Sequence, residues 1–216
     1  KVGLATIIVE VIAGEPNAPG LKCSDVQKDG SIRLGWSQPV MDSILEFNYW
    51  RIYGSSSPNG PWAVVDSIPH FDTVTTVVPS QGAISYFYME MSTGPCDFIS
   101  QPSDTVNTMT MSLTAVPPGS PEYAQLSWTP YNSGGLNPFR GNIYEIWVEA
   151  PERSGNWQNV GETTSTTFTD TVSVGDLTVA YQIRVPETVV GCFSGSTQAT
   201  LRFLDCTNNA NTELYQ

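Results

Sequence analysis

The chain has few residues of the kinds that carry catalysis or bind metal ions and phosphate. It has one histidine (His70), four cysteines, and nine lysines plus arginines against 21 aspartates plus glutamates in 216 residues. With a formal net charge of -12, it has no basic stripe to neutralise a nucleic acid backbone or an anionic membrane. None of its cysteines stands in a Cys-x-x-Cys pair, which argues against a zinc site and thiol redox chemistry. We therefore expect no nucleic acid partner, no metal and no cofactor.

Long hydrophobic runs are also missing. No apolar stretch approaches the ~20 residues needed to cross a bilayer, so we predict no membrane insertion. The first residues, KVGLATIIVEV, lack the small-residue cleavage site of a signal peptide, which is compatible with a mature chain or a fragment. Nothing in these absences points to a membrane protein.

The residues that could support an enzyme are scattered. His70 lies between Pro69 and Phe71 in a predicted loop, with no nucleophile motif beside it. Carboxylates for glycoside chemistry or for a calcium ion would have to come from loop residues: Asp97, Asp170, Asp176 and Glu187. Two small sandwiches offer no deep cleft in which these residues could form a site. No nucleotide-binding glycine loop is present. We predict that the chain is not an enzyme.

What the chain does have is a duplication. Ser31–Val65 and Ala124–Val160 share a Leu-x-Trp, a polar gap, an aromatic run around a central Ile and a closing Trp-x-x-Val. Corresponding positions lie roughly 92 to 96 residues apart, the size of one small domain rather than of a solenoid repeat. The Leu-x-Trp segments alternate apolar and polar residues, as a strand with one buried face does. We expect Trp36 and Trp128 to lie in two separate cores.

The pattern predicts an all-β chain made of two tandem seven-stranded β-sandwiches. Short strands with turn signals every 8 to 12 residues are typical of such sandwiches. The predicted organisation is an N-terminal strand at 1–15, module 1 at 16–110, module 2 at 111–205 and a polar tail at 206–216. The last strands are predicted at 105–111 in module 1 and at 198–204 in module 2, and Tyr181 is expected to face inward.

The N-terminal run Ala5–Ile12 is rich in β-branched residues and ends before a proline-containing linker. It reads as the last strand of an upstream module, the interpretation that we favour. The alternative is an added strand that pairs with another edge or another chain.

The order of these motifs resembles that of fibronectin type III domains over about residues 16–204. In such domains the tryptophans at Trp36 and Trp128 are core residues, and Tyr181 corresponds to the tyrosine of the penultimate strand. Module 1 departs from the pattern, because Tyr86, Phe87 and Tyr88 all compete for that place.

A narrower resemblance concerns residues 16–36 and 95–106, which are similar to tandem modules of large secreted surface proteins of gliding Bacteroidetes, exported by the type IX route. That resemblance implies O-glycosylation at Asp followed by Ser or Thr and an aliphatic residue. The motif occurs five times, with acceptors Ser43, Ser67, Thr73, Thr105 and Thr171. Asp-Thr is also ordinary turn chemistry, so the alternative is that these are strand-to-strand turns.

The cysteines read as structural disulfides of a secreted protein. Few charges, many small polar residues and cysteines at module edges fit an oxidising compartment. Cys96 and Cys192 follow the late strand of each module, whereas Cys23 and Cys206 lie on a first and a last strand. We predict Cys23–Cys96 and Cys192–Cys206, with exchange of partners across the modules as the alternative.

Three functions remain open at this stage. The first is a non-catalytic structural or adhesive segment of a cell-surface protein, whose partners are neighbouring modules. The second is a carbohydrate-binding module that contacts surface glycans through Trp62 and Trp157, which stand just past hairpin turns where an indole can stack on a sugar or cover the sandwich edge. The third is an assembly subunit in which the strand Ala5–Ile12 completes the sheet of a neighbour. The fold alone does not choose among them.

Overall fold

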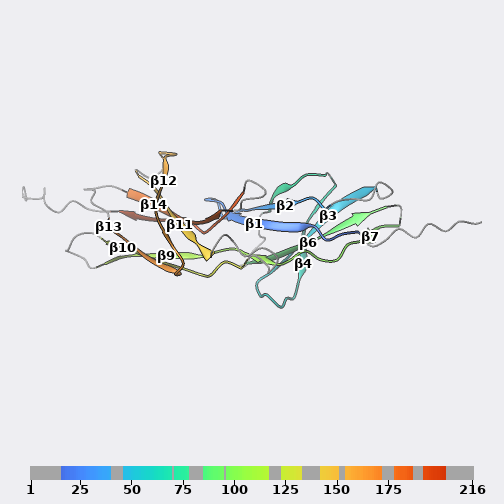
Figure 1. The fold of residues 1–216 in the computed structure, drawn as a ribbon, viewed down its shortest axis with the longest axis horizontal. Helices are drawn as coiled ribbons and strands as arrows, with labels where there is room; N and C mark the ends of the chain where they lie inside the picture. Colours follow the sequence, from blue (N-terminus) through green and yellow to red (C-terminus); the bar gives the residue numbers. More distant parts are fainter. Residues whose placement is uncertain are drawn as a thin grey trace, which may run out of the picture.

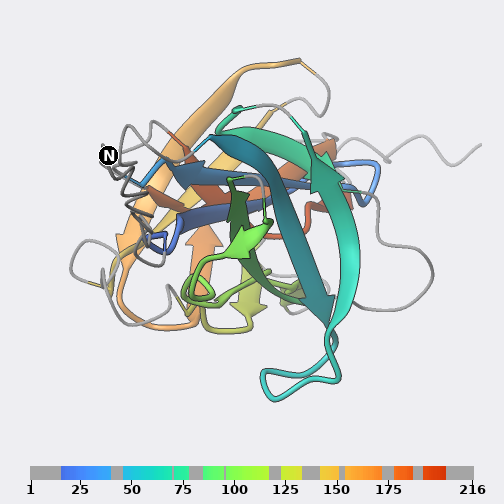
Figure 2. The same ribbon diagram turned by 90° about the vertical axis from the view of Figure 1, so that its right-hand side faces the viewer.

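The computed structural model describes residues 16–39, 46–69, 71–77, 85–94, 96–116, 123–132, 142–150, 154–171, 178–186 and 192–202. These residues form β-strands and contain no α-helix, so none of them builds a helix that could cross a membrane. The molecule is elongated, with β9 to β14 at one end and β2 to β7 at the other (Figure 1). Figure 2 views the molecule from the end that carries β2 to β7, so module 1 lies in front of module 2.

Module 1 is a sandwich of two antiparallel sheets. One sheet has the order β1-β2-β5, and the other has the order β4-β3-β6-β7 with β8 also paired to β6. The strands are β1 Gly20–Val26, β2 Ile32–Ser37, β3 Phe47–Ser55, β4 Ala63–Ile68, β5 Val74–Val77, β6 Tyr86–Thr93, β7 Phe98–Ile99 and β8 Val106–Asn107.

Module 2 repeats this arrangement strand for strand. Its sheets have the orders β13-β10-β9 and β12-β11-β14-β15, with β16 also paired to β14. The strands are β9 Met111–Val116, β10 Tyr123–Trp128, β11 Tyr144–Glu149, β12 Trp157–Thr163, β13 Thr167–Thr171, β14 Thr178–Pro186, β15 Phe193–Gly195 and β16 Ala199–Arg202. The predicted fold class, two tandem β-sandwiches, is confirmed.

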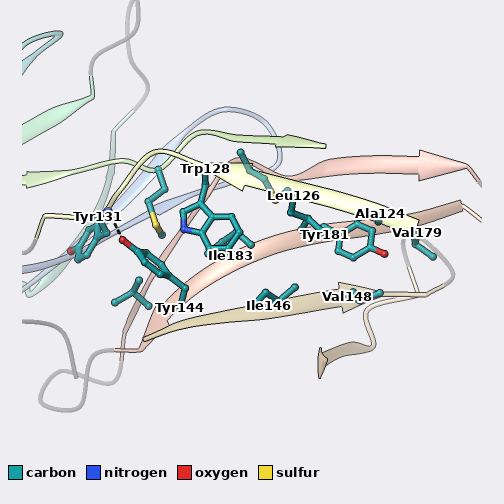
Figure 3. Packing of buried hydrophobic residues seen from close by; sticks show 13 residues of the cluster. Ala124, Leu126, Trp128, Tyr131, Tyr144, Ile146, Val148, Val179, Tyr181 and Ile183 are labelled. Atoms are coloured by element: carbon teal, nitrogen blue, oxygen red, sulfur yellow. Dashed lines mark hydrogen bonds between the residues drawn. The ribbon is translucent and has the colours of Figure 1, made fainter. Parts of the chain in front are cut away.

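The two-residue period of the sequence places the core between the sheets of each module. Ile32, Leu34 and Trp36 are buried in β2 whereas Arg33 is exposed. Trp36 packs edge-on against Trp50, with ring centroids 5.9 Å apart. In module 2 the same place holds Trp128 and Tyr144, 5.4 Å apart and again edge-on (Figure 3).

The core predictions are confirmed. Trp36 is fully buried and Trp128 is 6% exposed, and each belongs to its own hydrophobic cluster. Tyr181 faces inward and is fully buried, and its counterpart among the three module 1 candidates is Phe87, because Phe87 is buried while Tyr86 and Tyr88 are only partly covered.

The last strand of each module is split in two, which the sequence-based strands at 105–111 and 198–204 did not anticipate. β7 pairs with the end of β6 and β8 with its start, and β15 and β16 divide β14 in the same way. Serines bridge the gaps. The Ser103 N–H donates to the Met89 carbonyl (2.8 Å) and its Oγ accepts from the Met89 N–H (2.9 Å). Ser196 makes the same two bonds to Ile183, both at 2.9 Å.

Several predictions fall outside the described residues. These are the N-terminal strand Ala5–Ile12, the acceptor Ser43, His70, Asp176, Glu187 and Cys206.

Candidate functional site

The joint between the two modules is the most elaborate polar site of the described residues. Strand β15 of module 2 lies against β1 of module 1 near the middle of the molecule (Figure 1). Cys23 of β1 and Cys192, the residue before β15, form a disulfide with Cα atoms 6.3 Å apart. The joint is therefore covalent in addition to the chain connection between β8 and β9.

This disulfide corrects the predicted pairing. Cys23–Cys96 is wrong, because the β6–β7 hairpin that carries Cys96 lies at the end of module 1 remote from module 2 (Figure 1). Cys192–Cys206 is wrong as well, since Cys192 is bonded to Cys23. Exchange across the modules, the stated alternative, is what occurs at Cys23 and Cys192. Cys96 is an exposed free thiol, so its assignment to a disulfide is also corrected.

Gly35 makes room for the disulfide. A Cβ atom at this position of β2 would lie 2.7 Å from the Cys23 Sγ and 3.3 Å from the Cys192 Sγ. The first distance is shorter than Cβ contacts in proteins and the second is tighter than most of them, so a side chain here would have to displace the sulfur atoms. A glycine inside a strongly patterned strand was the sequence signal of this close approach.

Buried serines and an asparagine connect the strands around the joint. The Ser24 N–H donates to the Ser194 Oγ of module 2 (3.1 Å), and the Ser24 Oγ donates to the Asn107 carbonyl (2.8 Å). Both serines are fully buried. Since a buried polar group is costly without a partner, the Ser24–Ser194 bond favours one relative position of the two modules, and the Ser24–Asn107 bond holds β1 beside β8 within module 1.

The connection between the modules is tied to module 2 as well. The Asn107 Nδ2 donates to the Pro130 carbonyl (2.9 Å), and its Oδ1 accepts from the Asn132 N–H (2.5 Å). The Tyr131 hydroxyl reaches back to module 1, where it donates to the Lys22 carbonyl (3.1 Å). Loop residues of module 2 are thus hydrogen-bonded to both β1 and β8 of module 1.

A carboxylate lies at the centre of the joint. Asp25 is 7% exposed, and its oxygens accept from the Nε2 atoms of Gln27 (2.6 Å) and Gln182 (3.4 Å). Gln182 Oε1 accepts in turn from the Arg184 Nε (2.8 Å). Burial raises the pKa of Asp25 above its ordinary value, and the neighbouring amides and arginines oppose that rise without cancelling it. A side chain at Gly195 would collide with this carboxylate.

Arg184 also holds an aromatic stack on the outer face of module 2. Its guanidinium lies 4.5 Å from the centroids of Trp147 and Phe193 and 5.1 Å from that of Trp157. The arginine is only partly exposed, and burial lowers its pKa. Trp157, one of the two predicted sugar contacts, therefore has a cation over its ring.

Trp62, the other predicted sugar contact, has different neighbours. It packs edge-on against Tyr88 (4.8 Å), and Tyr88 stacks on Tyr53 (4.6 Å, 12° between planes). The Tyr53 hydroxyl donates to Glu90 Oε2 (2.9 Å). Trp62 and Trp157 lie in different modules, so the structure does not bring them into one site.

The remaining candidates are spread out. Asp170 accepts from the Tyr181 hydroxyl (2.9 Å), whose pKa is raised by burial and by the carboxylate. Asp97 accepts from Asn48 (2.8 Å) and Ser92 (3.2 Å). In the part of the chain that the structure describes, no three His, Cys, Asp or Glu residues lie together as a metal site would require. Of the glycosylation acceptors, Ser67 and Thr171 are exposed while Thr73 and Thr105 are partly covered.

The residues that build the joint were mostly missed by sequence reasoning. The available signals were charged residues within predicted strands, Asp25 in the first strand of module 1 and Arg184 in the apolar alternation around Ile183. Such charges are buried in strands only when another group pairs with them.

No family model matches the chain, and no curated protein matches its sequence. Among solved structures, a segment of two fibronectin type III domains from chicken tenascin is 15% identical and aligns with 88% of this chain and 99% of that one, with a TM-score of 0.30. The crystal structure of chicken CNTN1 FN1–FN3 domains is 16% identical and aligns with 88% and 68%, with a TM-score of 0.33.

Proposed function

We propose that the chain is a non-catalytic structural or adhesive segment that acts as a rigid spacer of two modules. The observation that carries the proposal is the joint, in which a disulfide and a hydrogen bond between the fully buried Ser24 and Ser194 hold β15 on β1. Tandem modules joined only by a linker move relative to each other by default. Here the covalent and polar contacts favour one orientation.

The disulfide also adds to stability. It joins residues 169 positions apart, and closing a loop of that length stabilises the folded state by about 5 kcal/mol in the chain-entropy model. That is a large share of the margin of a small protein. A bond of this kind fits an oxidising compartment, which supports a secreted, extracellular protein.

Rigidity is tested by NMR relaxation on the wild-type chain and on Cys23→Ser/Cys192→Ser. The wild type should tumble as one elongated body, with a common diffusion tensor for both modules. The double variant should show two shorter and unequal correlation times. Cys96→Ser is the matched control and should behave as the wild type does. Independent tumbling of the wild-type modules would remove the proposal.

The finer assignment is to the large secreted surface proteins of gliding Bacteroidetes that the sequence resembles. Among the acceptors that the structure describes, Ser67 and Thr171 are the exposed ones. Intact mass of the protein from its native source tests this, because sugar on the Asp-Ser/Thr motifs adds hexose-sized increments. An unmodified mass would count against the assignment.

A second candidate function is carbohydrate binding by module 1. Trp62, Tyr88 and Tyr53 form a partly exposed aromatic group with the Glu90 carboxylate beside it, and such groups bind sugars by stacking and hydrogen bonds. Trp62→Ala should then abolish binding on a glycan array. Trp157→Ala is the control, since Arg184 covers its ring, and should leave binding unchanged. A wild-type chain that binds no glycan would exclude this function.

A further inference from the structure

The joint inside the molecule is made of two parts that every module possesses. Module 2 contributes a hairpin edge, β15 with the residue before it, and module 1 contributes its first strand, β1. Among the residues that the structure describes, each molecule therefore keeps one unused part of each kind. These are the hairpin edge β7 of module 1 and the first strand β9 of module 2.

The registers show that the unused parts correspond residue by residue to the used ones. Ser92 pairs with Ile99 and Pro186 with Phe193, so the two hairpins have equal length and Phe98 occupies the place of Cys192. On the first strands, Cys23 pairs with Gly35 and Ser112 with Ser127, each partner directly preceding a core tryptophan. Ser112 therefore occupies the place of Cys23.

Exposure distinguishes the unused hairpin from the used one. Phe98 is 42% and Ile99 39% exposed, whereas their counterparts are partly buried, Cys192 in the bond to β1 and Phe193 beneath the Arg184 guanidinium. Two large apolar side chains on an edge strand mark an interaction surface. On β9, Ser112 and Thr114 are exposed as well.

The two unused surfaces also differ from the inner joint in a complementary way. The inner joint places Asp25 against Gly195, where a side chain would collide with the carboxylate. On the unused parts, Thr114 stands at the place of Asp25, and the bulged pair Gln101-Pro102 stands at the place of Gly195. The hairpin of module 1 therefore has the larger Gln101-Pro102 where module 2 has Gly195, and β9 has the smaller, uncharged Thr114 where β1 has Asp25.

We propose that a second copy of this chain docks head to tail, with β7 of one copy on β9 of the next, as β15 lies on β1 within each molecule. Because the two surfaces differ, the contact is heterologous and generates a linear assembly. Failure of this proposal leaves the rigid spacer standing, since the inner joint does not depend on it.

The outer joint lacks the disulfide and the covalent chain connection of the inner one. A tether of that kind supplies an effective concentration in the millimolar range, so association in trans is weaker and calls for covalent trapping. The registers define the trap: cysteines at positions 98 and 112 reproduce the relation of Cys192 to Cys23.

The test uses the full chain with Phe98→Cys and Ser112→Cys in a Cys96→Ser/Cys206→Ser background. Mild oxidation should produce a ladder of covalent oligomers on a non-reducing gel, with peptide mapping showing a bond between positions 98 and 112. The matched control combines Phe98→Cys with Ser154→Cys, an exposed position of module 2 away from β9. The trapped fraction should exceed that of the control by about ten-fold or more. Equal trapping would overturn the proposal.

A second measurement uses the unmodified surfaces. Sedimentation of the wild-type chain should show a mass that rises with concentration, and Phe98→Asp should weaken this association about ten-fold or more, because an unpaired carboxylate is costly to bury. Phe98 is exposed in the single molecule, so thermal unfolding of the variant should match the wild type. A wild type that stays monomeric at millimolar concentration would contradict the proposal.

Discussion

The two modules share their interiors and differ on their outer surfaces. Ile52 and Ile146 are fully buried at equivalent places, and so are Met89 and Ile183. On the outer face the cross-strand pair Arg51–Glu90 of module 1 becomes Glu145–Arg184 in module 2, with the charges exchanged. The interior requires only apolar volume, whereas each outer face has acquired its own contacts.

The exchange of charges has a structural consequence. In module 1 the arginine lies over Tyr49 at the surface (4.9 Å), and the glutamate accepts from Tyr53. In module 2 the arginine lies on the neighbouring strand, where it reaches three aromatic rings and, through Gln182, the joint. The arginine of module 2 is thus connected to the joint, whereas the arginine of module 1 stays at the surface.

The largest expected effects concern the shared core. Trp36→Ala and Trp128→Ala should each lower the free energy of unfolding by about 3–5 kcal/mol, because a buried indole is replaced by a cavity. Trp36 is fully buried and Trp128 is 6% exposed, so Trp36→Ala should cost slightly more. Urea denaturation followed by circular dichroism measures both. A difference of several kcal/mol between them would show that the two cores are not equivalent.

The next test converts module 1 into module 2 at the joint. Gly35→Ser introduces the residue found at position 127 and pushes its Cβ against the Cys23 sulfur, so we expect a loss of about 1–3 kcal/mol and incomplete disulfide formation. Thermal unfolding and thiol titration measure the two effects. The reverse change, Ser127→Gly, should cost only about 0.5–1 kcal/mol and leave the disulfide intact. Equal effects of the two changes would show that Gly35 is not needed to make room for the disulfide.

A comparable effect is expected where the modules differ by one hydroxyl. Tyr181→Phe gives module 2 the phenylalanine that module 1 has at position 87 and removes the bond to Asp170, for a loss of about 1.5–3 kcal/mol. The comparison with Asp170→Asn, which keeps an acceptor, separates the charge from the hydrogen bond. Chemical denaturation measures both variants. An unchanged stability of Tyr181→Phe would show that the bond adds nothing.

The smallest effect is a dependence on pH. Burial raises the pKa of Asp25 above that of the unfolded chain, so the folded state holds this proton more tightly. The stabilising contribution is fully present below the unfolded pKa of 3.8 and is lost as pH rises through the folded pKa. Asp25→Asn should remove this dependence, so its stability relative to the wild type should increase from acidic to neutral pH. Thermal unfolding as a function of pH measures it, and Asp29→Asn, an exposed carboxylate of the same module whose pKa is lowered, should show the opposite trend.

The sequence predicts the parts of the fold that follow from alternation of apolar and polar residues. Leu34 and Trp36 on one strand, or Tyr181 and Ile183 on another, report their face directly, because the side-chain period of a strand is two. The split of the last strand was not predictable in this way, since Ser103 and Ser196 replace ladder bonds through side chains. The joint was not predictable either, because the disulfide pairing depends on the end of each module at which the β6–β7 or β14–β15 hairpin lies. The spacing of Cys23, Cys96 and Cys192 along the chain contains no such information.

The disulfide also determines how the protein responds to tension. When the chain is pulled at points on either side of the bond, the load enters at Cys23, crosses to Cys192 and continues through β15 and β16. The 169-residue loop between the two sulfur atoms is mechanically shielded, and roughly 600 Å of contour length stays hidden at the usual extension per residue. Under load the protein therefore extends little, until a reductant breaks the disulfide and releases the loop.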